Sequence, residues 1–278
     1  MSIKIVTDST CDLPPATIEK YGIHVVPLHI HFQDGHFLDG VDLTREEFYD
    51  KLVRAEEFPT TATPGMDGFK STYRMLIEEG AQEILSIHVS EALSATVNVA
   101  RKAAEEIDFP ITVLDSGQLS LGVGFLVVKA AQLVAAGKRI QDILQAVKEA
   151  GKRTYVLAAL DTLEYLRKSG RMNRFVAGIG SLLHVKPILK MNQGKPTSEL
   201  IRTHKRSLQR LVDYLREFGP LQELALVHTN APAEVEIFWE QIKSLYPDRE
   251  HPLSVTVTPV IGSHIGPGAV GFACQTKP

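Results

Sequence analysis

The 278-residue sequence has only two cysteines, Cys11 and Cys274, near opposite ends of the chain. This wide spacing predicts neither a disulfide framework nor a zinc knuckle. The amino terminus lacks a basic stretch followed by an apolar run, so it indicates a first strand rather than a secretion signal. The longest apolar region, Phe125–Ala136, is broken by Lys129 and Gln132 and is too short to span a bilayer. We therefore expect a cytoplasmic protein from a reducing compartment, without a transmembrane segment.

Neither sign of charge is in large excess, since the formal net charge is −3, and no basic stripe occurs. A nucleic-acid partner is therefore not expected. The chain has ten histidines but no H-E-x-x-H motif or other dense set of ligands, so no metal site is predicted. His29 and His31 are spaced as residues on the same face of a strand, and His24 lies just before them. We interpret all three as structural.

Motifs for nucleotide binding and for hydrolysis are missing as well. No G-x-x-x-x-G-K-[ST] loop occurs, and Gly122 and Gly124 lack the third glycine of a dinucleotide fingerprint. Ser94 lies in the segment ALSAT, which is not the nucleophile elbow of α/β-hydrolases. The sequence thus predicts no cofactor and gives no direct sign of a catalytic centre.

Short apolar runs alternate with segments of helical periodicity, a pattern typical of a parallel α/β sheet. The helical segments include Ile140–Val147 and Leu208–Leu215, in which apolar residues recur at i, i+3, i+4 and i+7. The predicted strands are Ile3–Val6, Val25–Ile30, Ile84–Val89, Ile111–Leu114, Tyr155–Leu160, Leu224–Val227, Val255–Val260 and Val270–Cys274.

The chain is long enough for two medium-sized α/β domains. We expect a helix over Lys138–Lys152 to close the first set of strand–helix units, so we predict domains at residues 1–150 and 151–278. The segment Met191–Ser198 contains Gly194 and Pro196 and predicts a hairpin turn, which indicates a mixed sheet in the second domain. The first domain should have a mostly parallel sheet flanked by helices.

Hydroxyl side chains follow three of the predicted strands of the first domain, and a fourth hydroxyl-rich segment lies in a loop. Ligands bind at the carboxyl ends of strands in open α/β sheets, and helix N-termini favour anions. The same residue types are also the usual helix N-caps, so a cap and a ligand site both remain open. The four segments are Asp8–Thr10, Ser90–Thr96, Asp115–Gly117 and Pro59–Gly65.

Several segments, in order along nearly the whole chain, resemble the DegV family of bacterial fatty-acid-binding proteins. They match the family's D-S-T-C-D-L opening, its P-x-T loop, its L-S-G-T segment, its D-S-x-x-x-S-x-G-x-G segment, its L-x-Y-L-x-K-G-G-R helix and turn, and its H-x-G-P-G loop. The matching segments are Asp8–Leu13, Phe48–Tyr49, Pro59–Pro64, Ser90–Thr96, Asp115–Gly124, Leu160–Arg171, Lys186–Leu189 and His264–Gly268.

This resemblance implies a bound long-chain fatty acid, such as palmitate, with its tail in an apolar cavity. It implies that Thr61 and Ser94 bind the carboxylate, and that Arg171 and His264 lie at the rim and face a partner. It also implies a partner, the catalytic subunit of a fatty acid kinase, and allows transient membrane contact. From the strand ends we add four further ligand-binding candidates: Ser9, Ser90, Asp115 and Ser116.

The sequence departs from the family pattern at several positions, among them Ala62, Ala95 and Ser169. Glu91 replaces a serine, and its carboxylate would repel a fatty-acid head group, so we expect Glu91 to point outward.

Two other functions remain open. A serine-dependent hydrolase or phosphotransferase for a lipid-like substrate could use Ser94 with His264 and Asp115. A purely structural or regulatory protein would instead have a closed and empty interior. Arg171, for its part, could simply cap its helix, because cations are favoured at helix C-termini.

Overall fold

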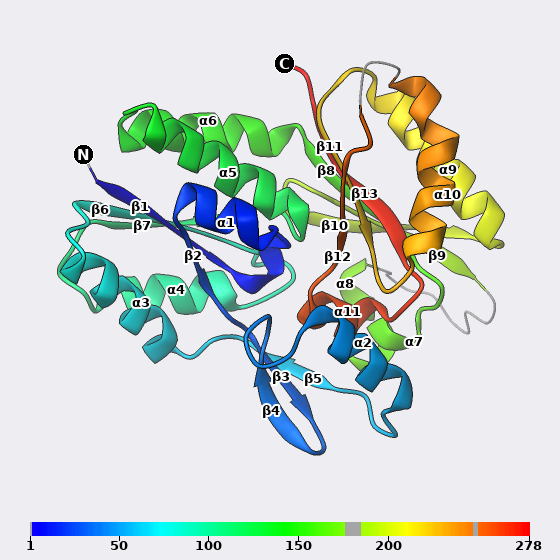
Figure 1. Cartoon of the computed structure of the whole chain (residues 1–278), viewed down its shortest axis with the longest axis horizontal. Coiled ribbons are helices and arrows are strands. Elements are labelled where there is room, and N and C mark those ends of the chain that lie inside the picture. The colour runs from blue at the N-terminus through cyan, green and yellow to red at the C-terminus, as the bar shows by residue number, and fades with distance from the viewer. Residues whose placement is uncertain (1, 176–184, 247–249) are drawn as a thin grey trace.

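The computed structural model describes residues 2–175, 185–246 and 250–278, which form an α/β structure with three sheets. Figure 1 shows an N-terminal sheet on the left, a C-terminal sheet on the right and a small sheet below them. The predicted class, two α/β units with a parallel and a mixed sheet, is confirmed. The small sheet was not predicted.

The N-terminal sheet is parallel, with strand order β2-β1-β6-β7. Alternate residues of β1 point to opposite faces, so that Ile3 and Ile5 pack against α5 and α6, while Val6 packs against α3 and α4. Helices thus cover both faces, which explains the continuous apolar runs. The elements are β1 (Ile3–Asp8), α1 (Pro15–Tyr21), β2 (Ile23–Val26), α3 (Met66–Glu78), β6 (Glu83–His88), α4 (Thr96–Glu105), β7 (Ile111–Asp115), α5 (Leu121–Ala135) and α6 (Ile140–Lys152).

The C-terminal sheet is mixed, with strand order β10-β9-β8-β13-β11-β12, and only β11 and β12 pair in parallel. The hairpin predicted at Met191–Ser198 is the β9–β10 hairpin. Helices α9 and α10 cover one face of this sheet. The elements are β8 (Thr154–Ala159), α7 (Glu164–Lys168), α8 (Met172–Phe175), β9 (Lys186–Asn192), β10 (Lys195–Ile201), α9 (His204–Phe218), β11 (Leu221–His228), α10 (Pro232–Ile242), β12 (Leu253–Thr256), α11 (Pro259–Ile265) and β13 (Val270–Thr276).

The single strand predicted over Val25–Ile30 is wrong, because two strands of different sheets occupy this segment. Pro27, which has no N–H to donate to a ladder, separates β2 from β3. Strand β3 joins the small antiparallel sheet, with order β4-β3-β5. Its elements are β3 (His29–Phe32), β4 (Gly35–Leu38) and β5 (Thr60–Ala62), and α2 (Arg45–Arg54) follows β4.

Two further predictions about local structure are wrong. The strand predicted over Val255–Val260 ends at Thr256, because Pro259 occupies the first position of α11, a position that proline favours. His264 consequently lies in the last turn of α11 rather than in the loop after it. The helix predicted within Leu160–Arg171 spans only Glu164–Lys168, since the Thr162 side chain accepts from the Glu164 N–H and starts the helix late.

Helix α5 packs between the two large sheets, where it contacts strands of both. Two glycines of α5 allow the neighbouring segments to approach the helix closely. A Cβ at Gly124 would lie 2.8 Å from the Cys11 carbonyl oxygen, and one at Gly122 would lie 2.6 Å from Val156 Cγ2. The division at residue 150 remains a prediction, because one apolar core contains residues from both halves. Within the described ranges, no helix has the length and apolar character needed to cross a membrane.

The central strand β13 also requires a glycine, and this requirement can be tested. A Cβ at Gly271 would contact the Leu157 carbonyl oxygen and lie 2.7 Å from Ala158 Cα, both in the neighbouring backbone of β8. We expect Gly271→Ala to lower the free energy of unfolding by about 1–3 kcal/mol, as overpacking does. Urea denaturation followed by circular dichroism measures it.

The control is Gly68→Ala in α3, where a Cβ would meet nothing closer than 3.8 Å. This change should leave the free energy of unfolding unchanged or raise it by up to about 1 kcal/mol, because alanine favours a helix. Equal stability of the two variants would contradict the close packing of β13 on β8.

Candidate functional site

A narrow cavity lies between the carboxyl ends of β1 and β6, one face of β8 and β9, and α11. Its volume is about 120 Å³, several times the roughly 10–15 Å³ that holds one water. Most of its wall is apolar. The apolar lining residues are Leu28, Ala62, Val89, Leu93, Leu119, Val156, Ala158, Leu160, Leu166, Phe175, Leu189, Met191, Val260, Ile261 and Ile265.

Four predicted site residues line this cavity: Thr61, Ser94, Arg171 and His264. They come from four separate segments, namely β5, the loop before α4, the turn after α7, and α11. The Thr61 hydroxyl and His264 Nε2 lie 3.0 Å apart, which joins the small sheet to α11. The fold therefore brings together residues that are up to 203 positions apart in the sequence.

His264 is neutral at physiological pH. Burial, together with the positive charges of Arg171 and Arg174, lowers the pKa of its imidazole from 6.5 to about 3. Its Nδ1 is buried and has no hydrogen-bond partner among the described residues. If Nε2 carries the proton and donates to Thr61, then the Thr61 hydroxyl is free to donate into the cavity.

Arg171 supplies positive charge to the cavity. Its Nη1 donates to the Ser169 carbonyl at the end of α7, at 2.6 Å, and the side chain makes no ion pair with any described residue. Burial and the nearby Arg174 lower its guanidinium pKa, but an arginine remains charged in proteins. The bond to Ser169 fits the helix-capping alternative, while the half-buried and unpaired charge fits an anion site.

Ser94 lies just before the N-terminus of α4. Its Oγ is 2.8 Å from the Thr96 hydroxyl and accepts weakly from the Thr96 N–H, at 3.3 Å. This backbone contact is cap-like, but Ser94 also keeps a place in the cavity wall. The N-terminus of a helix favours an anion, so the position suits a carboxylate.

The other four candidates do not line this cavity, and all except Ser9 make local turn contacts. Ser9 donates to Asp39 and lines a wider, more polar cleft of about 920 Å³ on the far side of the β1 loop. Ser90 accepts from the Ala92 N–H. Asp115 accepts from the Gly117 N–H, and Ser116 from the Gln118 N–H. Their ligand-binding role stays a prediction, because none of them lines the apolar cavity.

The residues of the alternative catalytic set are not assembled. Ser94 bonds to Thr96 and His264 to Thr61, whereas Asp115 lines other pockets. The prediction that Glu91 points outward is confirmed, since it is exposed and pairs with Arg101 at 3.1 Å. In the described part of the chain, no group of three or more histidine, cysteine or acidic side chains is arranged to hold a metal.

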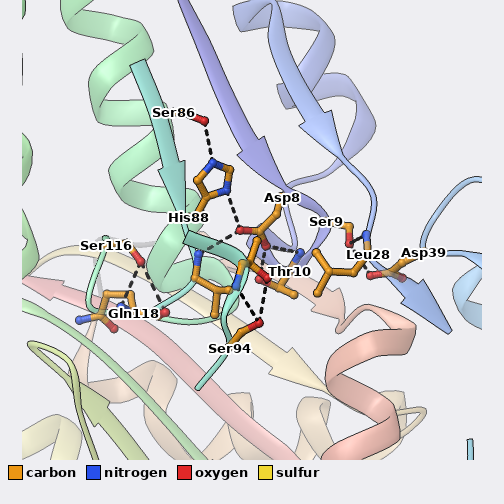
Figure 2. Close-up of polar contacts among 12 residues, drawn as sticks. Asp8, Ser9, Thr10, Leu28, Asp39, Ser86, His88, Ser94, Ser116 and Gln118 are labelled. Atoms are coloured by element: carbon orange, nitrogen blue, oxygen red, sulfur yellow. Dashed lines mark hydrogen bonds and ion pairs between the residues drawn. The ribbon is translucent and has the colours of Figure 1, made fainter. Parts of the chain in front are cut away.

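A buried polar network behind the cavity was not predicted. Figure 2 shows His88 between Asp8 and Ser86, at the ends of β1 and β6. His88 Nδ1 lies 3.0 Å from Asp8 Oδ2, and Nε2 lies 2.6 Å from Ser86 Oγ. The alternation of Ser86 and His88 with apolar residues in a buried strand was the available signal. Polar side chains on one face of such a strand must find partners inside the protein.

The depressed pKa of His264 generates a prediction about stability. An unfolded His264 takes up a proton near pH 6.5, whereas the folded one does so only near pH 3, so folding is progressively penalised as pH falls through this window. We expect His264→Gln, which keeps an amide N–H near the position of Nε2, to flatten the loss of melting temperature between these pH values. The measurement is thermal unfolding of lipid-free protein at several pH values.

The change His204→Gln serves as the control, because His204 is bound to Glu234 on the outside of the C-terminal sheet. If both variants lose stability on acidification as steeply as the parent, His264 is not held neutral.

Comparison with known proteins places the chain in a family. The model described as "Uncharacterised protein, DegV family" matches residues 2–277. A DegV domain-containing protein of Listeria innocua is 33% identical over 280 residues, 99% of each chain. A fatty-acid-binding DegV family structure from Thermus thermophilus is 30% identical, with a TM-score of 0.90 and full coverage of both chains. DegV of Bacillus subtilis, described as a fatty acid binding protein, is 31% identical over 99% of this chain and 100% of that one, with a TM-score of 0.90. This chain belongs to the DegV family.

Proposed function

We propose that the chain binds one long-chain fatty acid, such as palmitate, and carries it without a reaction of its own. The observation that carries this proposal is the cavity itself, which joins an apolar wall to a positive charge without an ion-pair partner among the described residues. The relatives from Thermus thermophilus and Bacillus subtilis, both described as fatty-acid-binding, support it.

The apolar wall provides most of the affinity. Burying an acyl chain contributes about 0.8 kcal/mol per CH₂ group, so roughly 14 groups contribute on the order of 11 kcal/mol before ordering costs. The contacts to the carboxylate then determine which end of the chain enters first. An unpaired carboxylate inside the apolar wall would be strongly disfavoured, which orients the ligand with its head group at the polar residues.

Each of the four predicted site residues that line the cavity has a part in binding the carboxylate. Thr61 accepts from His264 and directs its own proton to one carboxylate oxygen, while Ser94 donates from the N-terminus of α4. Arg171 provides the counter-charge, which the neutral His264 cannot. In this arrangement an ionised acid is favoured over an ester or an alcohol of equal length.

A finer proposal concerns the partner. We infer that Arg171 and His264 also present the carboxylate to the catalytic subunit of a fatty acid kinase. Arg171 is only half-buried and the exposed Arg174 lies close by, so positive charge extends from the cavity to the surface. A positive rim favours the encounter with an anionic partner site or with the phosphates of a nucleotide.

The hydrolase alternative is disfavoured by geometry, because Ser94 has no histidine at hydrogen-bonding distance among the described residues. A carrier retains intact lipid during purification, whereas a hydrolase releases its product. Retained lipid therefore separates the two functions.

Purified from a bacterial host, the protein should retain roughly one fatty acid of about C14–C18 per chain, because only a tail of this length buries enough CH₂ groups. Denaturing extraction and mass spectrometry identify the lipid.

Thr61→Val and Ser94→Ala each remove a hydrogen bond to a charged group, so each should weaken palmitate binding about ten- to a hundredfold.

The matched control is Thr72→Val in α3, whose hydroxyl donates to the Gly68 carbonyl far from the cavity. It should bind palmitate like the parent. Repeated preparations without acyl lipid would argue against the carrier, and a Thr61/Ser94 double variant that binds palmitate normally would place the head group elsewhere.

For the docking role, Arg171→Ala should weaken palmitate binding only modestly, because the apolar wall provides most of the affinity. Phosphorylation of the bound acid by a cognate kinase subunit should nevertheless fall sharply, because a rim charge affects encounter more than burial. Kinase turnover and a direct lipid titration are measured side by side. Arg167→Ala provides the control, since Arg167 is an exposed arginine on the adjacent α7.

Normal turnover of Arg171→Ala would reject the docking role. A large drop in melting temperature with this variant, and not with Arg167→Ala, would instead support the role of Arg171 as a helix cap.

A further inference from the structure

Four hydrogen-bond donors converge on the buried carboxylate of Asp8. Oδ2 accepts from His88 Nδ1 and from the Val89 N–H, each at 3.0 Å. Oδ1 accepts from the Thr10 N–H at 3.1 Å and from the Thr10 hydroxyl at 2.5 Å. Asp8 is fully buried. Burial alone would raise its pKa, but the hydrogen bonds from His88, Thr10 and Val89 outweigh this effect and lower the pKa, so the group is a carboxylate.

Two of these partners, Thr10 and Val89, also line the cavity. They belong to different loops, one after β1 and the other after β6, and Asp8 is bonded to both. In Figure 2 the carboxylate lies between the two loops, with His88 behind it. A residue that fixes the position of Asp8 therefore also fixes the positions of Thr10 and Val89 relative to each other.

His88 has the geometry to hold Asp8. Its second nitrogen lies 2.6 Å from Ser86 Oγ, which in turn lies 2.9 Å from the hydroxyl of Tyr73. The ring of Phe69 packs edge-on against the imidazole, with centroids 5.1 Å apart. A consistent direction of donation runs from Tyr73 through Ser86 to Nε2, which leaves Nδ1 to donate to Asp8.

The order Ser86–His88–Asp8 resembles that of a hydrolytic triad, yet it cannot act as one. All three side chains are fully buried, and Ser86 does not line the cavity. The Ser86 hydroxyl is already bonded on both sides. These residues can therefore affect the site only through structure, by way of the Asp8 carboxylate, which is bonded to two residues of the cavity wall.

We propose that His88 is a positioning residue for the ligand site, which sets the cavity wall at Thr10 and Val89 by fixing the carboxylate of Asp8. This inference rests on the proposed function, because the ligand whose affinity reports on the wall is a fatty acid. The bond that matters is the one from Nδ1 to Asp8. The bond from Nε2 to Ser86 only orients the ring.

Two substitutions separate these bonds. In His88→Asn the amide nitrogen takes the place of Nδ1 and keeps a donor for Asp8, whereas in His88→Gln it reaches toward Ser86 and leaves Asp8 without this donor. Both variants lose packing and should melt earlier than the parent. We expect His88→Asn to bind palmitate like the parent and His88→Gln to bind about three- to thirtyfold more weakly, as mutations along coupled networks do.

The measurements are palmitate titration of lipid-free protein and thermal unfolding of the same samples. Ile242→Val, at the end of α10 and buried in the C-terminal core, provides a variant with lowered stability and an intact network. Its palmitate affinity should match that of the parent. Equal affinities of the Asn and Gln variants, or affinities that follow melting temperature across all variants, would overturn the positioning role.

Proton NMR on the parent protein gives a readout that does not depend on whether a variant folds. The buried Nδ1 proton of His88 should give a separate downfield resonance, and saturation with palmitate should shift it through Thr10 and Asp8. An unmoved resonance at saturation would overturn the positioning role alone. A parent that binds no palmitate would overturn the proposed function, and the positioning role with it.

Discussion

The buried carboxylate of Asp8 is the constraint on which the ligand site depends. A charge removed from water needs hydrogen bonds to every oxygen, and here the donors are His88 together with backbone and hydroxyl groups of the flanking loops. The loop after β1 supplies both donors to Oδ1, and the end of β6 supplies both donors to Oδ2. Displacing either segment would leave one carboxylate oxygen unpaired, which is costly for a buried acid.

The apolar wall and the polar residues of the cavity have different roles, one in affinity and the other in selectivity for the head group. Its apolar wall attracts any long hydrocarbon, and nothing in that attraction depends on the head group. Discrimination between head groups comes instead from the electrostatics of the polar residues. His264 is neutral because burial and two neighbouring arginines disfavour its proton, so the positive charge of the cavity wall comes from Arg171 and from Lys190, which pairs with Glu199 at 3.9 Å. Arg171 has no such ion-pair partner among the described residues, and an unpaired cation of this kind suits an anionic head group.

Much of the fold follows from local sequence. Buried strands flanked by helices produced the continuous apolar runs, and an apolar cavity does lie at the carboxyl ends of β1 and β6. Other features depend on tertiary context. The run Val25–Ile30 is apolar apart from His29, and only Pro27 signals that its two halves enter different sheets. Arg171 and His264 lie far apart in sequence from Thr61, so no spacing could have joined them, and only the family resemblance suggested the set.

The hydroxyl residues show why strand ends alone do not identify a ligand site. Ser9, Ser90 and Ser116 lie beside free backbone N–H groups or a buried acid, and their hydroxyls are used there. Thr61 lies within strand β5, where the ladder already satisfies the neighbouring backbone. Its hydroxyl has no local amide to bond, so it meets His264 Nε2 across the fold while lining the cavity. A hydroxyl inside a short strand beside a cavity is therefore a better candidate than one at a helix start, because the local backbone makes no competing demand on it.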